Sequence, residues 1–232
     1  YPGATSGGPW PWHLSSISPF NPYLLTAKGY AVLYPGLPMG PEGVAAEPLS
    51  GLAQNVLAAI DHAIEQGYAD PDRLGLFGHS YGGYGALGIL SQTRRFKAAI
   101  VSAAPTNLLS IYGQFDPRFY PDANPAMYRS LMWWAEAGQG RMGGPPWANT
   151  ARYIRNSPLF AVEQISTPLM LVQGDRDFVP VSQGEEMFTA LYRLNKQAIF
   201  LRYAGEGHVL ASPANIRDFV RRMIDWYDHF LR

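Results

Sequence analysis

The chain has 232 residues, of which 47% are hydrophobic, enough to bury the core of one large domain. Its 18 Lys and Arg equal its 18 Asp and Glu, so the net charge gives no reason to expect a nucleic acid or a membrane as a partner. It has no Cys, which excludes disulfides and thiolate metal sites, and no apolar run is long enough to span a bilayer. No metal ion or organic cofactor is implied. The compartment is left open, since no secretory signal is visible in this stretch.

The N-terminal quarter begins as loop and then predicts a strand and a helix. Gly, Pro, Ser and Trp dominate residues 1–22, a composition that is typical of loop. Residues 29–36 (GYAVLYPG) are a short apolar run and predict a buried strand followed by a turn. From Leu52 the apolar residues recur at helical spacing, and Gly67 follows as a stop, which predicts a helix.

The rest of the chain alternates strands with helices. Further strands are predicted from apolar runs at 73–80, 96–105, 168–175 and 197–205. Helices are predicted up to about Thr93, from a capping box at Ser182 and Glu185, and from Pro213 to about Leu231. Residues 106–160 lack a clear period and are interpreted as an irregular or helical insertion. The alternation indicates an α/β fold, a mostly parallel sheet with helices on both faces, in a single domain over residues 1–232.

The stretch GHSYGGYGAL, which begins at Gly78, places one serine among glycines where a predicted strand meets a predicted helix. Residues 78–82 match G-x-S-x-G, and this junction is the setting of a nucleophile elbow, a strained turn that raises the serine hydroxyl above the sheet. Gly78 and Gly82 would leave room for the close approach of strand and helix. Ser80 is therefore the candidate nucleophile, and the alternative is a Gly-rich buried helix with an idle serine.

A second glycine pattern overlaps the first. Residues 83–88 (GYGALG) match G-x-G-x-x-G, the dinucleotide-binding pattern. That interpretation requires an acidic residue at the end of the next strand, whereas the next strand ends in IVSAAPTN. The glycines also fall inside the predicted helix rather than in the turn before it. Dinucleotide binding is therefore disfavoured.

A serine nucleophile requires a base and an acid that orients the base. In α/β-hydrolases the chain order is Ser, then Asp or Glu, then His. Asp175 and Asp177 follow the fourth predicted strand, and His208 follows the fifth and is the only histidine between Ser80 and the last predicted helix. The alternatives are that the aspartates only stabilise a turn and that His208 is a loop histidine. His79 adjoins Ser80 and is expected to diverge from it.

Several segments taken together resemble the catalytic domain of the prolyl oligopeptidase (S9) family of serine peptidases. They are GHSYGGYGAL, QTRRFKAAI, RYIRNSPLF, STPLMLVQGDRDFVPVSQGEEMFTAL and YAGEGHVL, spread over about residues 29–231. The resemblance implies an α/β-hydrolase fold, the hydrolysis of short peptides, and an N-terminal β-propeller that restricts entry to the site. It implies Ser80 as nucleophile and His208 as base, and the family pattern G-x-x-D-x-V-P makes Asp177 rather than Asp175 the acid.

Further site residues are expected around these three. The backbone N–H of the residue after the nucleophile, Tyr81, is expected to contact the oxyanion. A tyrosine hydroxyl is a second oxyanion donor in the family, and by resemblance this would be Tyr1. Because loops at the carboxyl ends of strands line the site in α/β folds, Tyr112, Phe115 and Phe119 are expected to line a hydrophobic substrate pocket. The alternative is that these rings form the core of the insertion.

The sequence therefore predicts a serine peptidase that acts through an acyl-enzyme. A carboxylesterase or lipase-like hydrolase of the same fold and a non-catalytic binding domain are the alternatives. The run at 29–36 resembles the fourth strand of an α/β-hydrolase sheet, and if the third strand is absent, a central position of the sheet is empty. Residues 1–232 are therefore expected to be the C-terminal part of a longer chain, whose upstream part holds the early strands and a propeller.

Overall fold

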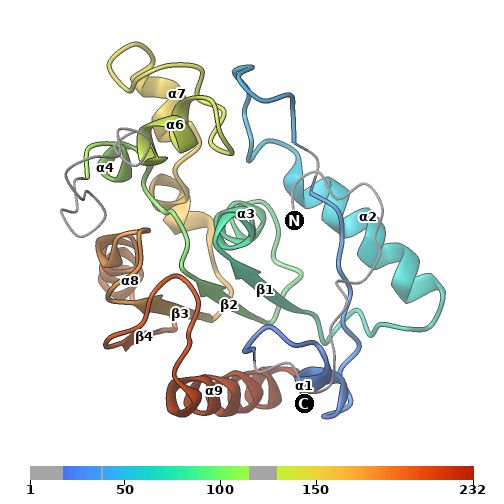
Figure 1. The fold of residues 1–232 in the computed structure, drawn as a ribbon. Helices are drawn as coiled ribbons and strands as arrows, with labels where there is room; N and C mark the ends of the chain where they lie inside the picture. The colour runs from blue at the N-terminus through green and yellow to red at the C-terminus, as the bar shows by residue number, and fades with distance from the viewer. Residues whose placement is uncertain (1–17, 38, 115–129) are drawn as a thin grey trace.

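The computed structural model describes residues 18–37, 39–114 and 130–232, and within them four parallel strands form one sheet (Figure 1). The sheet order is β1-β2-β3-β4, with strands β1 Gly75–His79, β2 Ala98–Ser102, β3 Leu169–Gly174 and β4 Ala198–Tyr203. Each strand lies within a segment predicted as strand. The expected α/β class with a mostly parallel sheet is confirmed.

Helices connect the strands and cover the sheet. Their bounds are α1 Tyr23–Thr26, α2 Leu52–Glu65, α3 Tyr81–Leu90, α4 Leu108–Tyr112, α6 Ser130–Glu136, α7 Thr150–Arg155, the 3-10 helix η2 Pro158–Gln164, α8 Val181–Arg193 and α9 Pro213–Leu231. The long helices α2, α8 and α9 lie where the sequence predicts helices. Within the described residues, none of these helices is both long and apolar enough to cross a bilayer.

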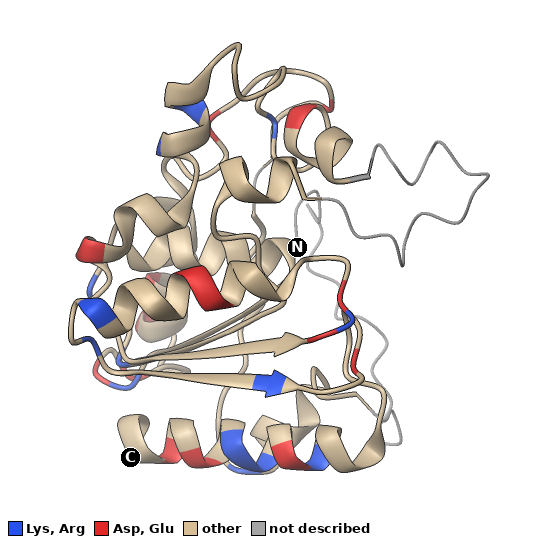
Figure 2. Ribbon diagram, turned by 90° about the vertical axis from the view of Figure 1, so that its left-hand side faces the viewer, with Lys and Arg blue, Asp and Glu red and all other residues tan. Residues whose placement is uncertain are grey.

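Alternate residues of the two central strands enter two separate cores, as expected for strands that are buried on both faces. One core joins one face of the sheet to α2, α3 and α8, and its strand residues are Ala99, Val101, Leu169 and Leu171. The other core joins the opposite face to α9, and its strand residues are Ala98, Ile100, Met170 and Val172. Figure 2 shows the sheet between α9, which ends at the C-terminus, and the layer of helices on the other side.

The segment 29–36 does not form the predicted buried strand. The chain has no strand from Tyr30 to Gly36, and the side chains of Leu33 and Tyr34 are 48% and 54% exposed. A strand requires a neighbour for its backbone N–H and C=O groups, and in the described part of the chain no strand lies beside this segment. The prediction is wrong because an apolar run does not by itself supply a partner.

The predicted capping box does not open α8. The helix begins after Pro180, and no side chain caps its first turn. The Ser182 hydroxyl instead accepts a hydrogen bond from Gln114 Nε2 at 2.7 Å, and Glu185 lies 3.4 Å from the guanidinium of Arg202. Both side chains contact other elements, which a pattern of neighbouring residues does not reveal.

Candidate active site

The chain turns sharply between β1 and α3 at Ser80. This residue has φ 57° and ψ −125°, a conformation that costs energy for any residue other than glycine. Its N–H donates to the carbonyl of Ser102 at 2.8 Å, and its own carbonyl accepts from the N–H of Tyr84 at 3.0 Å. These bonds to β2 and α3 hold the strained residue at the carboxyl end of the sheet.

Close backbone contact at this turn requires glycine at one of the two predicted positions. A Cβ at Gly78 would lie 2.2 Å from the carbonyl oxygen of Gly82 and 2.8 Å from the Cα of Gly83. A Cβ at Gly82 would meet open space, so the prediction that Gly82 also makes room is wrong. Further along α3, a Cβ at Gly88 would lie 2.6 Å from the Leu49 side chain, so this helix is closely packed behind the serine.

Three side chains from three loops meet at the carboxyl end of the sheet. His208 Nε2 lies 2.8 Å from Ser80 Oγ, and His208 Nδ1 lies 2.8 Å from Asp177 Oδ1. The Asp177 side chain is fully buried, whereas the His208 side chain is 22% exposed. The imidazole can therefore exchange a proton with the serine hydroxyl while the carboxylate fixes its orientation.

The Asp177 carboxylate is hydrogen-bonded on both oxygens. Oδ1 also accepts from the N–H of Val179 at 2.8 Å, and Oδ2 accepts from Gln173 Nε2 at 2.9 Å. Gln173 is 2% exposed, and the same amide nitrogen donates to the Val179 carbonyl at 2.9 Å. Sequence reasoning missed Gln173, and the available signal was one polar residue in the apolar run LMLVQG.

Asp175 is hydrogen-bonded to the segment that precedes His208. Its Oδ1 accepts from the N–H of Gly205 at 2.7 Å, and its N–H donates to the Tyr203 carbonyl at 3.1 Å. The N–H of Arg176 donates to the Glu206 carbonyl at 2.8 Å. The loop after β3 is thus tied to the loop that carries His208.

The Glu206 side chain fixes the His208 loop to the start of α9. Its carboxylate accepts from the N–H groups of Ala211 at 2.7 Å and Ser212 at 3.0 Å, and from Asn215 Nδ2 at 2.6 Å. Burial alone would raise the pKa of Glu206, but the hydrogen bonds from Ala211, Asn215 and Ser212 outweigh burial and lower it. Sequence reasoning missed this role, although Glu206 stands two residues before His208.

His79 does not point away from the site as expected. Its ring centroid lies 4.8 Å from that of His208, and its Nδ1 lies 3.3 Å from the Ser102 hydroxyl. Burial, and secondarily the proximity of His208, lowers the pKa of His79 to about 3, so this ring is neutral at ordinary pH. On the acid loop, the ring of Phe178 lies 4.2 Å from His208, centroid to centroid.

Tyr81 is the first residue of α3. The N–H groups in the first turn of a helix have no acceptor within the helix, so the Tyr81 N–H is suited to an oxyanion beside Ser80. The Tyr81 side chain is 1% exposed, and its hydroxyl has no hydrogen-bond partner among the described residues. Burial raises the pKa of this hydroxyl to about 12. Tyr1, the second expected oxyanion donor, lies outside the described residues.

The predicted pocket residues are only partly described. Tyr112 ends α4, and its ring makes edge-on contacts with Trp147 and Tyr153 at centroid distances of 5.7 and 6.0 Å. These contacts give Tyr112 a place in an aromatic cluster, and its role as a pocket wall stays a prediction. Phe115 and Phe119 lie outside the described residues.

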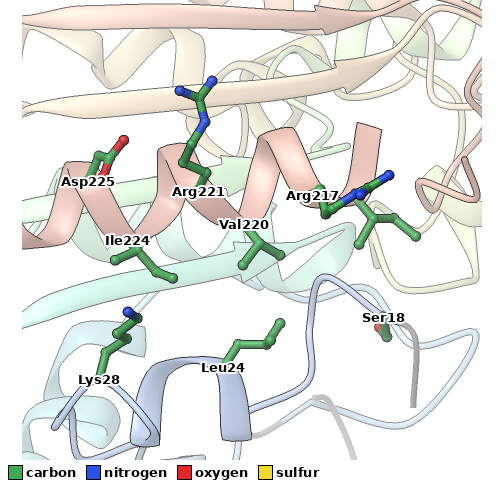
Figure 3. A pocket seen from close by; sticks show the side chains of 9 residues that line it. Ser18, Leu24, Lys28, Arg217, Val220, Arg221, Ile224 and Asp225 are labelled. Atoms are coloured by element: carbon green, nitrogen blue, oxygen red, sulfur yellow. The ribbon is translucent and has the colours of Figure 1, made fainter. Parts of the chain in front are cut away.

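A groove of about 470 Å³ lies away from these residues, between α1 and α9 (Figure 3). Apolar and basic side chains line most of it, with one serine and one aspartate: Ser18, Leu24, Lys28, Ile216, Arg217, Val220, Arg221, Ile224 and Asp225. None of the residues Ser80, Asp177 and His208 therefore lines this groove. In the described ranges of the chain, no group of three or more His, Asp or Glu side chains could hold a metal ion.

Comparisons with known proteins point to one family. The sequence model of the prolyl oligopeptidase family (peptidase S9) matches residues 15–232. The uncharacterized peptidase YuxL of Bacillus subtilis is 31% identical over 222 residues, which cover 90% of this chain and 31% of that protein. Dipeptidyl-peptidase 5 of Porphyromonas endodontalis is 29% identical over 245 residues, which cover 97% of this chain and 32% of that protein. The chain thus spans about a third of the length of these relatives.

A solved structure shares the fold. A puromycin-hydrolyzing peptidase of Mycobacterium tuberculosis matches with a TM-score of 0.65 and 25% identity, over 77% of this chain and 25% of that chain. The shared part is again a fraction of the longer protein.

Proposed function

The chain belongs to the prolyl oligopeptidase family, and from this premise we propose that it forms the catalytic part of a serine peptidase that hydrolyses short peptides. The observation that carries the proposal is the line of contacts from Ser80 through His208 to Asp177, with both hydrogen-bond distances at 2.8 Å. This order of a hydroxyl, an imidazole and a buried carboxylate is the one that nucleophilic acyl transfer requires.

In the proposed reaction, Ser80 Oγ attacks the carbonyl carbon of the scissile peptide bond. His208 Nε2 takes the hydroxyl proton and then donates it to the departing amine, leaving an acyl group on Ser80. Asp177 accepts the hydrogen bond of His208 Nδ1, which keeps the imidazole in the tautomer that presents a free Nε2 to the serine. A water molecule then attacks the acyl carbon while His208 takes its proton, and His208 returns that proton to Ser80 Oγ as the acid product departs.

Negative charge develops on the substrate carbonyl oxygen while the acyl-enzyme forms and again while it is hydrolysed. The Tyr81 N–H at the start of α3 is the proposed donor to this oxygen, since it adjoins the nucleophile and has no acceptor within the helix. Tyr1 as a second donor is proposed from the family resemblance alone. The neutral state of His79 supports the scheme, because a second positive charge beside His208 would oppose formation of the imidazolium.

Relatives support peptides as the substrate class. Two of them are named as a peptidase and as a dipeptidyl-peptidase, and the solved structure is named as a puromycin-hydrolyzing peptidase. The restriction to short peptides and the propeller that would impose it rest on the family resemblance. Tyr112, Phe115 and Phe119 remain proposed residues of the substrate pocket.

The test of the nucleophile uses the complete natural protein and a serine-directed phosphonate. We expect the phosphonate to label Ser80, and Ser80→Ala to lose labelling and to reduce kcat by at least about a thousandfold with the fold intact. The acid is tested by a matched pair. Asp177→Asn should reduce kcat by about a thousandfold or more, whereas Asp175→Asn should change it far less. An equal loss in both variants would contradict the assignment of Asp177.

A substrate panel tests the reaction class. Short peptides with free and with blocked N-termini are compared with esters of the same acyl groups. We expect peptide bonds to be cleaved, and the dependence on the free N-terminus separates exopeptidase from endopeptidase activity. Cleavage of the esters alone would favour a carboxylesterase, and labelling without any turnover would favour a binding domain.

A further inference from the structure

An exposed aromatic ring lies against the imidazole of His208. The Phe178 side chain is 45% exposed, yet its ring centroid lies 4.2 Å from that of His208, with 34° between the ring planes. A large apolar side chain that stays half in water gains little from burial. Its contact with the proposed base therefore calls for a reason other than packing of the core.

The position of Phe178 is fixed by its two chain neighbours. Asp177 precedes it and is fully buried, and Val179 follows it and is 3% exposed. The Val179 N–H donates to Asp177 Oδ1 at 2.8 Å, and Gln173 Nε2 donates to both residues. The backbone of Phe178 is thus held between two anchored residues, with its ring beside His208.

A second ring, that of His79 at the end of β1, lies beside His208. His79 lies 4.8 Å from His208, and the ring of Phe20 lies 4.4 Å from His79, both measured between centroids. Phe20 in turn lies 5.7 Å from Phe77 of β1. The imidazole of His208 therefore has one aromatic neighbour from the acid loop and one from the end of β1.

Hydrogen bonds alone leave one motion of the His208 ring free. Bonds at Nδ1 and Nε2 fix two points of the ring, and the ring can still tilt about the line that joins them. Such a tilt moves the lone pair of Nε2 away from the Ser80 hydroxyl. An aromatic ring against the imidazole resists the tilt, and an imidazolium is attracted to the face of an aromatic ring more strongly than a neutral imidazole is.

We propose that Phe178 is a positioning residue, which holds the His208 imidazole in line with the Ser80 hydroxyl. This inference rests on the proposed function, since it assigns a role to Phe178 only if His208 is the base. Phe178 acts through His208, so its replacement should change the rate of the chemical step rather than the binding of substrate.

The test compares Phe178→Leu with Phe178→Tyr in the complete natural protein. Leucine keeps an apolar side chain and removes the ring, whereas tyrosine keeps the ring. We expect Phe178→Leu to lower kcat about threefold to tenfold with KM unchanged, and Phe178→Tyr to restore kcat to within about twofold of the parent. Phe160→Leu is the matched control, because Phe160 is 50% exposed and lies in η2.

The rate of labelling by a small phosphonate without a peptide portion is the second readout. This rate reports the reactivity of Ser80 without substrate contacts, and it should fall in Phe178→Leu by the same factor as kcat. A rise in KM with an unchanged labelling rate would overturn the proposal and make Phe178 a substrate contact. Equal losses in the leucine and tyrosine variants, or no loss in either, would also overturn it. Ser80→Ala is assayed in parallel, so that persistent turnover in that variant identifies a failure of the proposed function itself.

Discussion

The Asp177 carboxylate has a fixed hydrogen-bond donor for each of its oxygens, and Gln173 supplies the donor for Oδ2. Gln173→Leu would leave that oxygen buried and without this partner, which costs about 1–3 kcal/mol and frees the carboxylate to rotate. We expect kcat to fall by about tenfold or more, with KM much less affected.

The control for this prediction is Gln92→Leu. Gln92, like Gln173, donates two hydrogen bonds from its amide nitrogen. They go to the carbonyls of Leu49 at 2.7 Å and Gly88 at 2.9 Å and to none of the three proposed catalytic residues. Both variants should lower the melting temperature. Only Gln173→Leu should lower kcat once kcat is expressed per folded molecule. An unchanged kcat in Gln173→Leu would show that Asp177 keeps its orientation without this bond.

The hydrogen bonds to the Glu206 carboxylate make the stability of the protein fall as the pH is lowered. Because the folded-state pKa of Glu206 lies below its ordinary value of 4.5, its contribution to stability is fully present above that value and is lost as the pH falls through the lowered folded-state pKa. Glu206→Gln should therefore destabilise the protein at pH 7, by about 1–3 kcal/mol, and progressively less on acidification below about pH 4.5.

Urea unfolding of the parent and of Glu206→Gln at a series of pH values between 7 and 3 measures this difference. Asn215→Ala provides a graded comparison, since it removes one of the three donors, that at 2.6 Å, and leaves the carboxylate in place. A destabilisation by Glu206→Gln that is the same at every pH would mean that the charge of Glu206 contributes nothing.

Sequence patterns predicted some residues of the site and missed others, and the two groups differ in how they act. Ser80 and His208 each follow the end of a strand, and parallel strands bring such positions together, so order and spacing were sufficient to predict them. Order and spacing left Asp175 and Asp177 both open as the acid, and only the family resemblance favoured Asp177. Gln173 and Glu206 act through hydrogen bonds to residues four to nine positions further along the chain, and neither strand nor helix periodicity encodes such bonds.

At the scale of elements, the end of β3 and the His208 loop approach each other as closely as backbones can. A Cβ on Gly174 would lie 2.4 Å from the carbonyl oxygens of both Glu206 and Gly207. Gly174→Ala must therefore displace the His208 loop, and we expect a loss of at least about 1–3 kcal/mol in unfolding free energy, with a fall in kcat.

Gly207→Ala is the matched variant on the other side of this contact. A Cβ at Gly207 would meet no atom within 4 Å, and its φ is not positive, so the alanine fits. Its unfolding free energy should stay within about 0.5 kcal/mol of the parent. Equal destabilisation of the two variants in urea unfolding would contradict the close approach at Gly174.

Elements with strong internal patterns were predictable, and elements that depend on a neighbour were not. The apolar spacing of α2 and the burial of β2 and β3 follow from their own residues. The run at 29–36 has the composition of a strand, but without a strand beside it the segment stays irregular. The first turn of α8 was mispredicted for a related reason, because Ser182 and Glu185 bind partners from other segments.

At the scale of the whole molecule, the two edges of the sheet are unlike each other. The edge strand β4 carries Arg202, which is 53% exposed and pairs with Glu185, and a charged side chain on an edge discourages pairing with another strand. The edge strand β1 has the sequence GLFGH, and its histidine is neutral because burial lowers the pKa of His79 to about 3. β1 thus lacks the protection that β4 has, as expected of a strand that another strand covers.

The amides of β1 allow this to be measured. The N–H of Ser80 donates to Ser102 of β2 at 2.8 Å, and successive N–H groups alternate between the two edges of a strand, so the N–H groups of Leu76 and Gly78 face β2 while those of Phe77 and His79 face the other edge. In the described residues no strand pairs with that edge.

We therefore predict that, in residues 1–232 alone, the amides of Phe77 and His79 exchange with solvent at least about tenfold faster than those of Leu76 and Gly78. In the complete natural protein, a strand from flanking sequence would pair with this edge and protect all four amides to a similar degree. Residues 1–232 alone would lack the hydrogen bonds of that strand and would leave the edge of β1 open to other chains, so they should also melt at a lower temperature and be less soluble. Amide exchange followed by NMR or mass spectrometry on the two proteins measures the protection of the four amides, and thermal unfolding of the two proteins measures the difference in melting temperature. Equal protection of the four amides in residues 1–232 alone would mean that this edge is already paired, and the expectation of an additional strand would lose its physical basis.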